Sequence, residues 1–220
     1  MKRTIVLLSA AMSTPTAAPT ATAKGAATRD AIVARAYDIA RCSGVEGLSI
    51  GPLAAAVGMS KSGVFAHFGS REDLQHAVLE EAALRFGNQV LVPALSQPRG
   101  LPRLRAIMSN WFEWVRGSTG GCVLMGSVSE YDDRPGMLRD QVVHNERRWR
   151  TELQRAVQIA IDCGHLVDGD VDQYVFELYA IPLAAHHEAG LFGYDTARRH
   201  GDAAVERWIA AYTPAASPSR

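Results

Sequence analysis

One stretch near the N-terminus, from Leu48 to Leu74, constrains the fold of this chain more than any other feature. Its sequence is LSIGPLAAAVGMSKSGVFAHFGSREDL, in which short apolar segments alternate with Gly and Ser. Ser49 is placed to cap a short helix that has Pro52 in its first turn, and Ser60 is placed to cap another. The Gly-Met-Ser turn between them predicts two short helices that are tightly joined.

Longer helices are predicted on both sides of this stretch. From Thr28, apolar residues recur at the spacing of one helix face until Ser43-Gly44, which is a favourable helix terminus. On the other side, Gly69-Ser70 breaks the chain, and Ser70 with Asp73 resembles the capping pair of a fourth helix that extends to about residue 90. Together the four segments predict a compact helical domain with a helix-turn-helix.

The remainder of the chain also has a helical pattern. Proline and glycine residues between Leu91 and Pro102 indicate a loop or an interrupted helix, and the domain boundary is expected there. Further helices are expected at about 103–116, 122–131, 135–163, 171–192 and 196–212, and no run alternates as strands do. The predicted fold is all-α, with a disordered arm at 1–26, a helix-turn-helix domain at 27–90, a second helical domain at 91–213 and a disordered tail at 214–220.

The block from Gly58 to Leu74, GMSKSGVFAHFGSREDL, resembles the recognition-helix signature of the tetracycline-repressor (TetR) family. Residues 28–48 resemble the first helix of that family. The resemblance implies a transcriptional regulator, usually a repressor, that binds palindromic double-stranded operator DNA as a homodimer and responds to a small-molecule effector. It also implies dimerisation through the last two helices, at about 171–192 and 196–212. No cofactor and no enzymatic activity are expected.

The resemblance places the DNA-binding residues in and around the third helix. Small, polar or cationic residues at its N-terminus let the backbone approach phosphates. Ser49 and Ser60 match capping positions that also touch phosphates, and Arg71 matches a frequent phosphate contact. Phe65 stands where the family commonly has Tyr, and with Phe68 it is expected to anchor the helix in the core. His67 is grouped with this surface, although packing within the domain is the favoured interpretation. The expected DNA-binding residues are Ser49, Ser60, Lys61, Ser62, Gly63, Phe65, His67 and Arg71.

The overall charge does not by itself favour DNA binding. The chain has 23 basic and 23 acidic residues and a formal net charge of +0, whereas positive charge supplies much of the affinity for DNA. The stretch from Ser49 to Arg71 nevertheless contains Lys61 and Arg71 and no acidic residue, which predicts a locally positive surface. Lys2 and Arg3, or Lys24 and Arg29, can add phosphate contacts.

The second domain is rich in aromatic residues and methionine. Any one of them is more often ordinary core, but as a group, interleaved with His144, Asn145 and His186, they are typical of an apolar pocket with polar anchors. The expected ligand-binding residues are Trp111, Met125, Trp149 and Tyr174, and the expected effector is apolar or aromatic. No metal site is expected at His186-His187-Glu188, because adjacent helical residues diverge by about 100°.

Several observations bear on location and on alternative functions. Three widely separated cysteines without a CxxC pair favour a reducing compartment, and the expected location is the cytoplasm, without membrane association. The segment after Met1 imitates a signal peptide, and a start at Met12 is an open alternative. A small all-α enzyme or ligand-binding protein without DNA function is the alternative class, although no GxSxG or Gly-rich phosphate loop is present.

Overall fold

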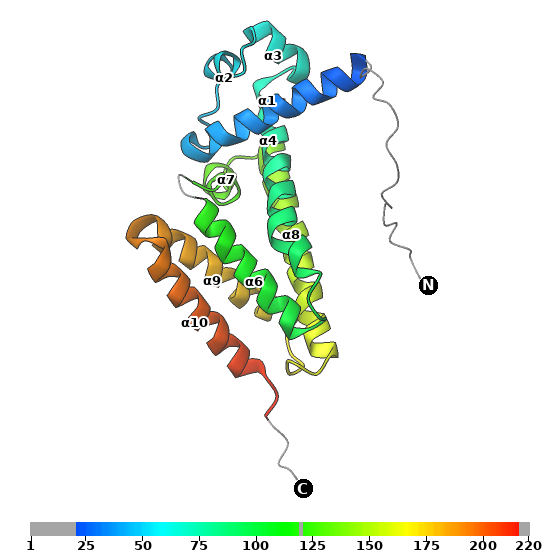
Figure 1. Ribbon diagram of the computed structural model, residues 1–220, viewed down its shortest axis with the longest axis vertical. Coiled ribbons are helices and arrows are strands. Elements are labelled where there is room, and N and C mark those ends of the chain that lie inside the picture. The colour runs from blue at the N-terminus through cyan, green and yellow to red at the C-terminus, as the bar shows by residue number, and fades with distance from the viewer. Residues whose placement is uncertain (1–20, 119–120, 216–220) are drawn as a thin grey trace, which may run out of the picture.

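The computed structural model describes residues 21–118 and 121–215, which fold into helices joined by short connections (Figure 1). These residues contain no strand, and the predicted all-α fold is confirmed. The N-terminal helices are α1 (Ala21–Ser43), α2 (Ile50–Ala56), α3 (Lys61–Phe68) and α4 (Arg71–Phe86). They form the upper end of the molecule in Figure 1, and α4 runs down from it towards the second domain.

Helices α3 and α4 begin at the residues that the capping pattern predicts. The hydroxyl of Ser60 accepts a hydrogen bond from the backbone N–H of Gly63 at 3.1 Å, and that of Ser70 accepts from the N–H of Asp73 at 3.0 Å. Each bond satisfies one of the N–H groups that a helix leaves without a partner in its first turn. Ser49 takes the N-cap position of α2, but its side chain makes no capping hydrogen bond there.

The third helix is anchored in the core by Val64 and Phe68, which are both buried. The guanidinium of Arg29 lies 5.0 Å from the ring centroid of Phe68 and covers its face. The prediction that Phe65 shares this core is wrong, because 42% of its surface is exposed. Val64 and Phe68 are four residues apart and face the same side of the helix, whereas Phe65 lies about 100° further round.

Helix α4 connects two hydrophobic cores. Leu74 and Val78 are buried in the first core with α1, α2 and α3, whereas Phe86 is buried in the second. The chain then stays helical through a π-helical turn, η1 (Gly87–Leu91), and a short helix, α5 (Val92–Ala94). The segment expected as a loop or interrupted helix therefore begins as a continuation of α4. Because α4 contributes buried side chains to both cores, a displacement of α4 would change the packing of both.

The second domain contains α6 (Leu101–Gly117), α7 (Val123–Tyr131), α8 (Met137–Asp162), α9 (Val171–Phe192) and α10 (Tyr194–Tyr212). The bounds of α9 are those that the sequence predicts, and the other helices begin and end within a few residues of the prediction. Helices α9 and α10 pack against each other at the lower left of Figure 1, with α6 against both.

Helix α7 and the start of α8 contribute side chains to the first core rather than the second. Val123, Tyr131, Leu138 and Val142 are buried with residues of α1 and α4. The helix-turn-helix domain is thus completed by two elements that follow it by more than thirty residues in the sequence. The two domains share a packed interface instead of being joined by a linker alone.

Helix α1 begins earlier than the sequence analysis predicts. Residues 21–26, expected in the disordered arm, form its first turns, although the expected start was Thr28. These residues are rich in alanine, which has the highest helix propensity, and the Thr28 hydroxyl donates to the carbonyl of Lys24 at 2.9 Å. The remainder of the expected arm, including the segment that imitates a signal peptide up to residue 20, lies outside the described residues.

No helix in the described ranges combines the length and the apolar character that crossing a membrane requires.

Candidate DNA-binding surface and effector cavity

The N-terminal end of α3 forms a polar, cationic surface. The side chains of Lys61 and Ser62 are exposed, and the Ser62 hydroxyl lies 3.0 Å from that of Ser60. The aliphatic stem of Lys61 lies against Gly51 of α2, where an added Cβ would be 3.4 Å from Cε of Lys61. Because a helix N-terminus carries free N–H groups and partial positive charge, this end of α3 is suited to an approaching phosphate.

Phe65 and His67, which are also expected to bind DNA, lie at different distances from the N-terminal end of α3. Phe65 is exposed beside it and is therefore available to a partner outside the domain. His67 lies in the last turn of α3, half-buried, with its ring centroid 6.4 Å from that of Phe68. The structure thus brings Phe65 to the same surface as Lys61 and gives His67 a packing position.

Arg71 is bonded within the domain. Its Nε donates to the carbonyl of Leu48 at 2.9 Å, its Nη2 donates to the carbonyl of Glu46, and the Glu46 carboxylate lies 3.5 Å from Nη2. These bonds fasten the start of α4 to the connection between α1 and α2. The structure therefore gives Arg71 a structural role through Nε and Nη2, while the side chain stays partly exposed and the phosphate contact expected for it stays a prediction.

The connection between α1 and α2 is also bonded to the second domain. The carboxylate of Glu130, in α7, accepts hydrogen bonds from the backbone N–H groups of Val45 at 3.2 Å and Glu46 at 2.9 Å. The Tyr131 hydroxyl donates to the Glu46 carboxylate at 3.1 Å. Burial and the Glu46 charge raise the pKa of Tyr131 above its ordinary value, which keeps this hydroxyl protonated. These bonds connect α7 directly to the base of the helix-turn-helix.

Replacing Glu130 with alanine is expected to lower the free energy of unfolding by about 1–2 kcal/mol, because two backbone N–H groups lose a charged acceptor. Urea unfolding at fixed protein concentration measures the change. Glu80→Ala is the matched control: Glu80 is an exposed glutamate in α4 whose carboxylate lies 3.8 Å from His76. It is expected to cost less than about 0.5 kcal/mol. Equal costs for the two variants would show that the Glu130 bonds contribute nothing to stability.

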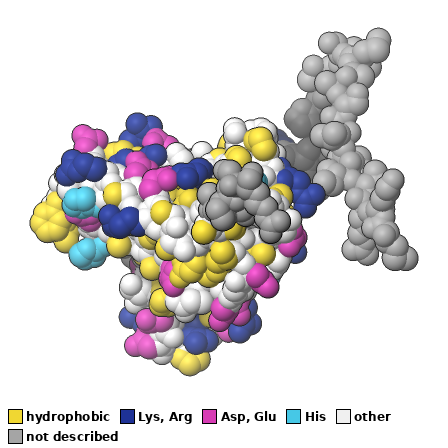
Figure 2. Space-filling view, turned by 90° about the horizontal axis from the view of Figure 1, so that it is seen from below, with side chains coloured by type: hydrophobic (Ala, Val, Ile, Leu, Met, Phe, Trp, Pro, Cys, Tyr) yellow, Lys and Arg dark blue, Asp and Glu magenta, His cyan; other side chains and the backbone are white. Residues whose placement is uncertain are grey.

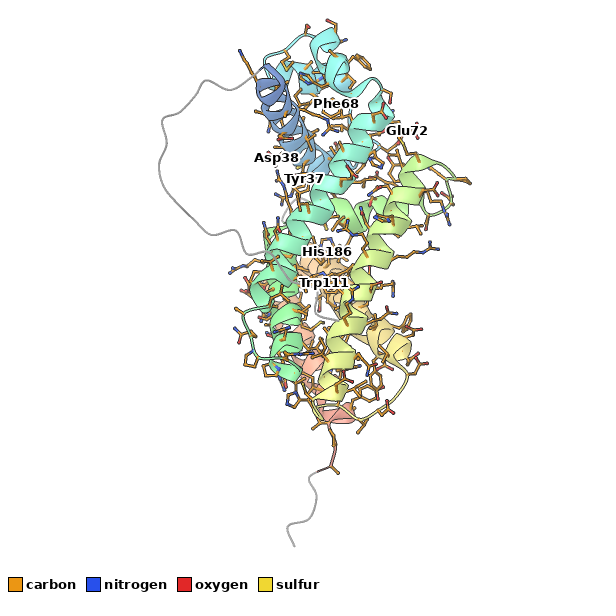
Figure 3. The ribbon with its side chains drawn as sticks, turned by 90° about the vertical axis from the view of Figure 1, so that its right-hand side faces the viewer. Tyr37, Asp38, Phe68, Glu72, Trp111 and His186 are labelled. Atoms are coloured by element: carbon orange, nitrogen blue, oxygen red, sulfur yellow. The ribbon has the colours of Figure 1, made fainter. Side chains whose placement is uncertain are left out.

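A cavity of about 420 Å³ lies between α4, α6, α7 and α8. Its aromatic wall consists of Phe86, Trp111, Trp114, Trp149 and Tyr179. The Phe86 ring meets Trp149 with centroids 4.7 Å apart and Trp114 with centroids 5.3 Å apart, in both cases edge to face. Figure 3 labels Trp111 between α4 and α8, in the middle of the molecule. Such a wall suits a flat apolar molecule.

The cavity includes three of the four residues expected to bind a ligand: Trp111, Met125 and Trp149 all lie on its wall. Tyr174 does not. Its ring packs against Tyr212 and Trp208 between α9 and α10, with centroid distances of 4.3 Å and 5.6 Å. Tyr174 is therefore a packing residue between α9 and α10 and does not line the cavity. The helical period shows that such a residue is buried, but it does not show against which helices.

Sequence reasoning missed several residues of the cavity wall. Phe86, Trp114 and Tyr179 line the cavity but are not among the residues that the sequence leads one to expect there. The available signal was spacing, since Trp114 lies one helical turn after Trp111. Glu130 carried no such signal, because its partners are 84 and 85 positions away in the sequence.

The polar side of the cavity is formed by α8. It contributes His144, Asn145, Glu146, Arg147, Arg148, Thr151, Glu152 and Arg155. The Tyr179 hydroxyl donates to Glu146 at 2.6 Å, and burial together with the Glu146 charge raises the pKa of Tyr179. The amide of Asn145 donates to the carbonyl of Leu79 in α4 at 3.2 Å. One residue of the wall is therefore bonded to the helix that connects the two cores.

The histidines of α9 are not arranged around a shared site. Burial, and then the neighbouring His187, lower the pKa of His186, which favours its neutral form. Glu188 instead contacts His200 of α10, with 2.8 Å between Oε1 and Nδ1. Across residues 21–118 and 121–215, no three His, Cys, Asp or Glu side chains are grouped as metal ligands would be.

Comparison with known protein families assigns both domains. Residues 32–78 match the family described as bacterial regulatory proteins, tetR family, and residues 100–205 match the tetracyclin repressor-like C-terminal domain. The first match contains α2, α3 and the polar end of α3, and the second contains α7, α8 and most of the cavity wall. A comparison with curated proteins found no significant match.

Solved structures give the same assignment. A TetR transcriptional regulator from Chloroflexus aurantiacus J-10-FL is 26% identical, with a TM-score of 0.80 over 88% of this chain and 99% of that chain. A TetR-family regulator from Cytophaga hutchinsonii is 20% identical, with a TM-score of 0.77 over 88% and 98%. AibR, solved in complex with isovaleryl coenzyme A and operator DNA, is 22% identical, with a TM-score of 0.65 over 85% and 98%. The two family matches and the shared fold show that the chain belongs to the tetracycline-repressor (TetR) family of DNA-binding transcriptional regulators.

Proposed function

We propose that the protein is a repressor that binds a palindromic operator in the cytoplasm as a homodimer and leaves it when a small apolar or aromatic effector occupies the cavity. The observation that carries the proposal is the end of α3, where Lys61 and Ser62 are exposed on a capped helix N-terminus. In a helix-turn-helix this end enters the major groove. No catalytic step is assigned to the cavity.

The exposed side of α9 supports dimerisation through the last two helices. Phe176, Leu183 and Leu191 are 62%, 37% and 63% exposed, and their spacing places them on the side of α9 opposite its buried residues. On α10, Ala203 and Ala210 are exposed small residues seven positions apart, which permit close approach of another helix. An apolar stripe of this kind on a helix pair suits a four-helix bundle between two copies. Seen from below, apolar side chains also reach the surface among charged ones (Figure 2).

The connections of the cavity support release by an effector. Asn145 links the cavity wall to α4, while α7 lines the cavity with Leu124 and Met125 and holds the α1–α2 connection through Glu130. An effector that prefers a displaced α7 or α8 shifts the helix-turn-helix with it, in proportion to its difference in affinity for the two states. Two recognition helices must lie about 34–36 Å apart to fit successive major grooves, so a small displacement weakens binding.

Lys61→Ala is expected to weaken binding to operator DNA by about tenfold at moderate salt, because each protomer loses one cation at the phosphate backbone. A mobility-shift titration with DNA from upstream of the protein's own gene measures this. The slope of log affinity against log salt concentration is also expected to fall by about 2 for the dimer.

Arg99→Ala is the control for this prediction, since it removes the same charge from an exposed residue beyond α5, at the other end of α4 from the helix-turn-helix. It is expected to leave affinity and salt slope unchanged. A folded dimer that prefers no sequence in a genome-wide selection would instead favour a ligand-binding protein without DNA function.

A further inference from the structure

The chemistry of the cavity wall identifies a class of effector, and this inference rests on the effector site of the proposed function. We propose that the effector is an aromatic carboxylate: a flat apolar body that carries a hydrogen-bond acceptor and a negative charge. Three features of the wall support this class, namely its aromatic rings, two indole N–H groups without an acceptor, and arginines without a carboxylate partner.

The two indole N–H groups belong to Trp114 and Trp149. Both side chains line the cavity, and both Nε1 atoms are buried without a hydrogen-bond acceptor among the described residues. Trp114 is only 7% exposed. By contrast, Nε1 of Trp208, away from the cavity, donates to Glu177 at 2.9 Å. Buried donors are nearly always paired, so these two indicate that the natural occupant supplies an oxygen acceptor.

The charges on the wall favour an anion. The two glutamates are already engaged: Glu146 accepts from the Tyr179 hydroxyl and lies 4.0 Å from Nε of Arg150, and Glu152 pairs with Arg155. Arg147 and Arg148 are exposed on the same wall and form no ion pair within the described chain. The charge left without a partner is therefore positive, and a guanidinium can bind a carboxylate through a bidentate pair of hydrogen bonds.

The three features together distinguish an aromatic acid from a hydrocarbon of the same shape. A hydrocarbon would pack against the aromatic wall but leave both indole N–H groups and the arginines unpaired. A neutral amide would satisfy the indoles alone. Only an anion with an oxygen acceptor uses all three features, so affinity is expected to rise in the order hydrocarbon, amide, carboxylate.

Naphthalene, 2-naphthamide and 2-naphthoate share one ring system and test this order. Calorimetric titration of the full chain, without DNA, is expected to show that 2-naphthoate binds at least about tenfold more tightly than naphthalene. Trp149→Phe keeps a ring but removes one N–H, and it is expected to weaken the naphthoate and the naphthamide by about tenfold while changing naphthalene less than about twofold. Trp114→Phe repeats the test at the second indole.

Arg148→Gln tests the contribution of the ligand's negative charge apart from that of its oxygen acceptor. It is expected to lower the affinity for 2-naphthoate by about tenfold and to leave the affinity for the two neutral compounds unchanged. Equal affinity for the three compounds, uniform weakening of all three by Trp149→Phe and Trp114→Phe, or no binding by any of them would overturn the inference. A mobility-shift assay with operator DNA distinguishes failure of this inference from failure of the proposed function. A chain that binds its operator but not 2-naphthoate contradicts only this inference, whereas one that binds 2-naphthoate but no operator contradicts only the repressor proposal.

Discussion

Gly121→Ala is expected to lower the free energy of unfolding by at least about 3 kcal/mol, because the new side chain meets both a strained backbone and a backbone neighbour. Gly121 has φ = +129°, which side chains other than glycine's rarely permit. A Cβ at this position would lie 2.0 Å from the carbonyl oxygen of Arg41 and 3.2 Å from its carbonyl carbon. Neither atom can move away without shifting α1.

This contact is where the start of α7 meets the helix-turn-helix domain. The Arg41 guanidinium reaches back across it, with Nη2 donating to the carbonyl of Gly117 at 2.7 Å and Nε to that of Gly121 at 3.5 Å. Cys122, the next residue, lies on the cavity wall. Gly121→Ala is therefore expected to disturb the contact between α1 and the start of α7, next to the cavity, and weaker operator binding is expected together with the loss of stability.

Urea unfolding of Gly121→Ala beside Gly126→Ala, at one protein concentration, provides the measurement. Gly126 lies inside α7, and an added Cβ would have no atom within 4 Å. Alanine there is expected to stabilise the protein by about 0.5–1 kcal/mol, since it lowers the entropy of the unfolded chain and favours the helix. If both alanines had the same effect, the close approach to Arg41 would not constrain the fold.

The sequence predicts the parts of this fold that depend on neighbours along the chain. The caps at Ser60 and Ser70 and the bounds of α9 depend on residues within one or two helical turns, and each is found where it was expected. The start of α1 was missed for a related reason: the residues before Thr28 have no apolar stripe, and their helix depends on alanine propensity.

The site was predicted less completely, because its key contacts join distant segments. Tyr174 and Trp149 are expected at the ligand site on the same ground, as aromatic residues of the second domain, yet only Trp149 lines the cavity. The structure also bonds Arg71 to Glu46 and Leu48, more than twenty positions earlier, and the sequence does not predict these two contacts. The phosphate contact expected for Arg71 stays a prediction. Partners at such separations are fixed by how helices pack, which a single sequence does not specify.

The largest functional effect is expected from charges placed on the proposed dimer face. Phe176→Glu combined with Leu191→Glu is expected to make the protein monomeric, because association would bury two carboxylates per copy without partners. Both residues are mostly exposed, so the fold of each copy should be retained. A monomer contacts only one half-site, and the loss of linkage between half-sites is expected to weaken operator binding by about 10²–10⁴-fold.

Leu84→Glu tests whether the position of the charge matters. Leu84 is 60% exposed on α4, away from α9 and α10, and this variant is expected to remain dimeric and to bind DNA normally. Sedimentation velocity reports the oligomeric state, and mobility shift reports the affinity. The cavity is formed within one protomer, so the double variant should still bind 2-naphthoate if the wild type does. A double variant that stays dimeric, or a Leu84→Glu protein that dissociates, would place the dimer interface on another surface, and the α9 stripe would then need a different partner.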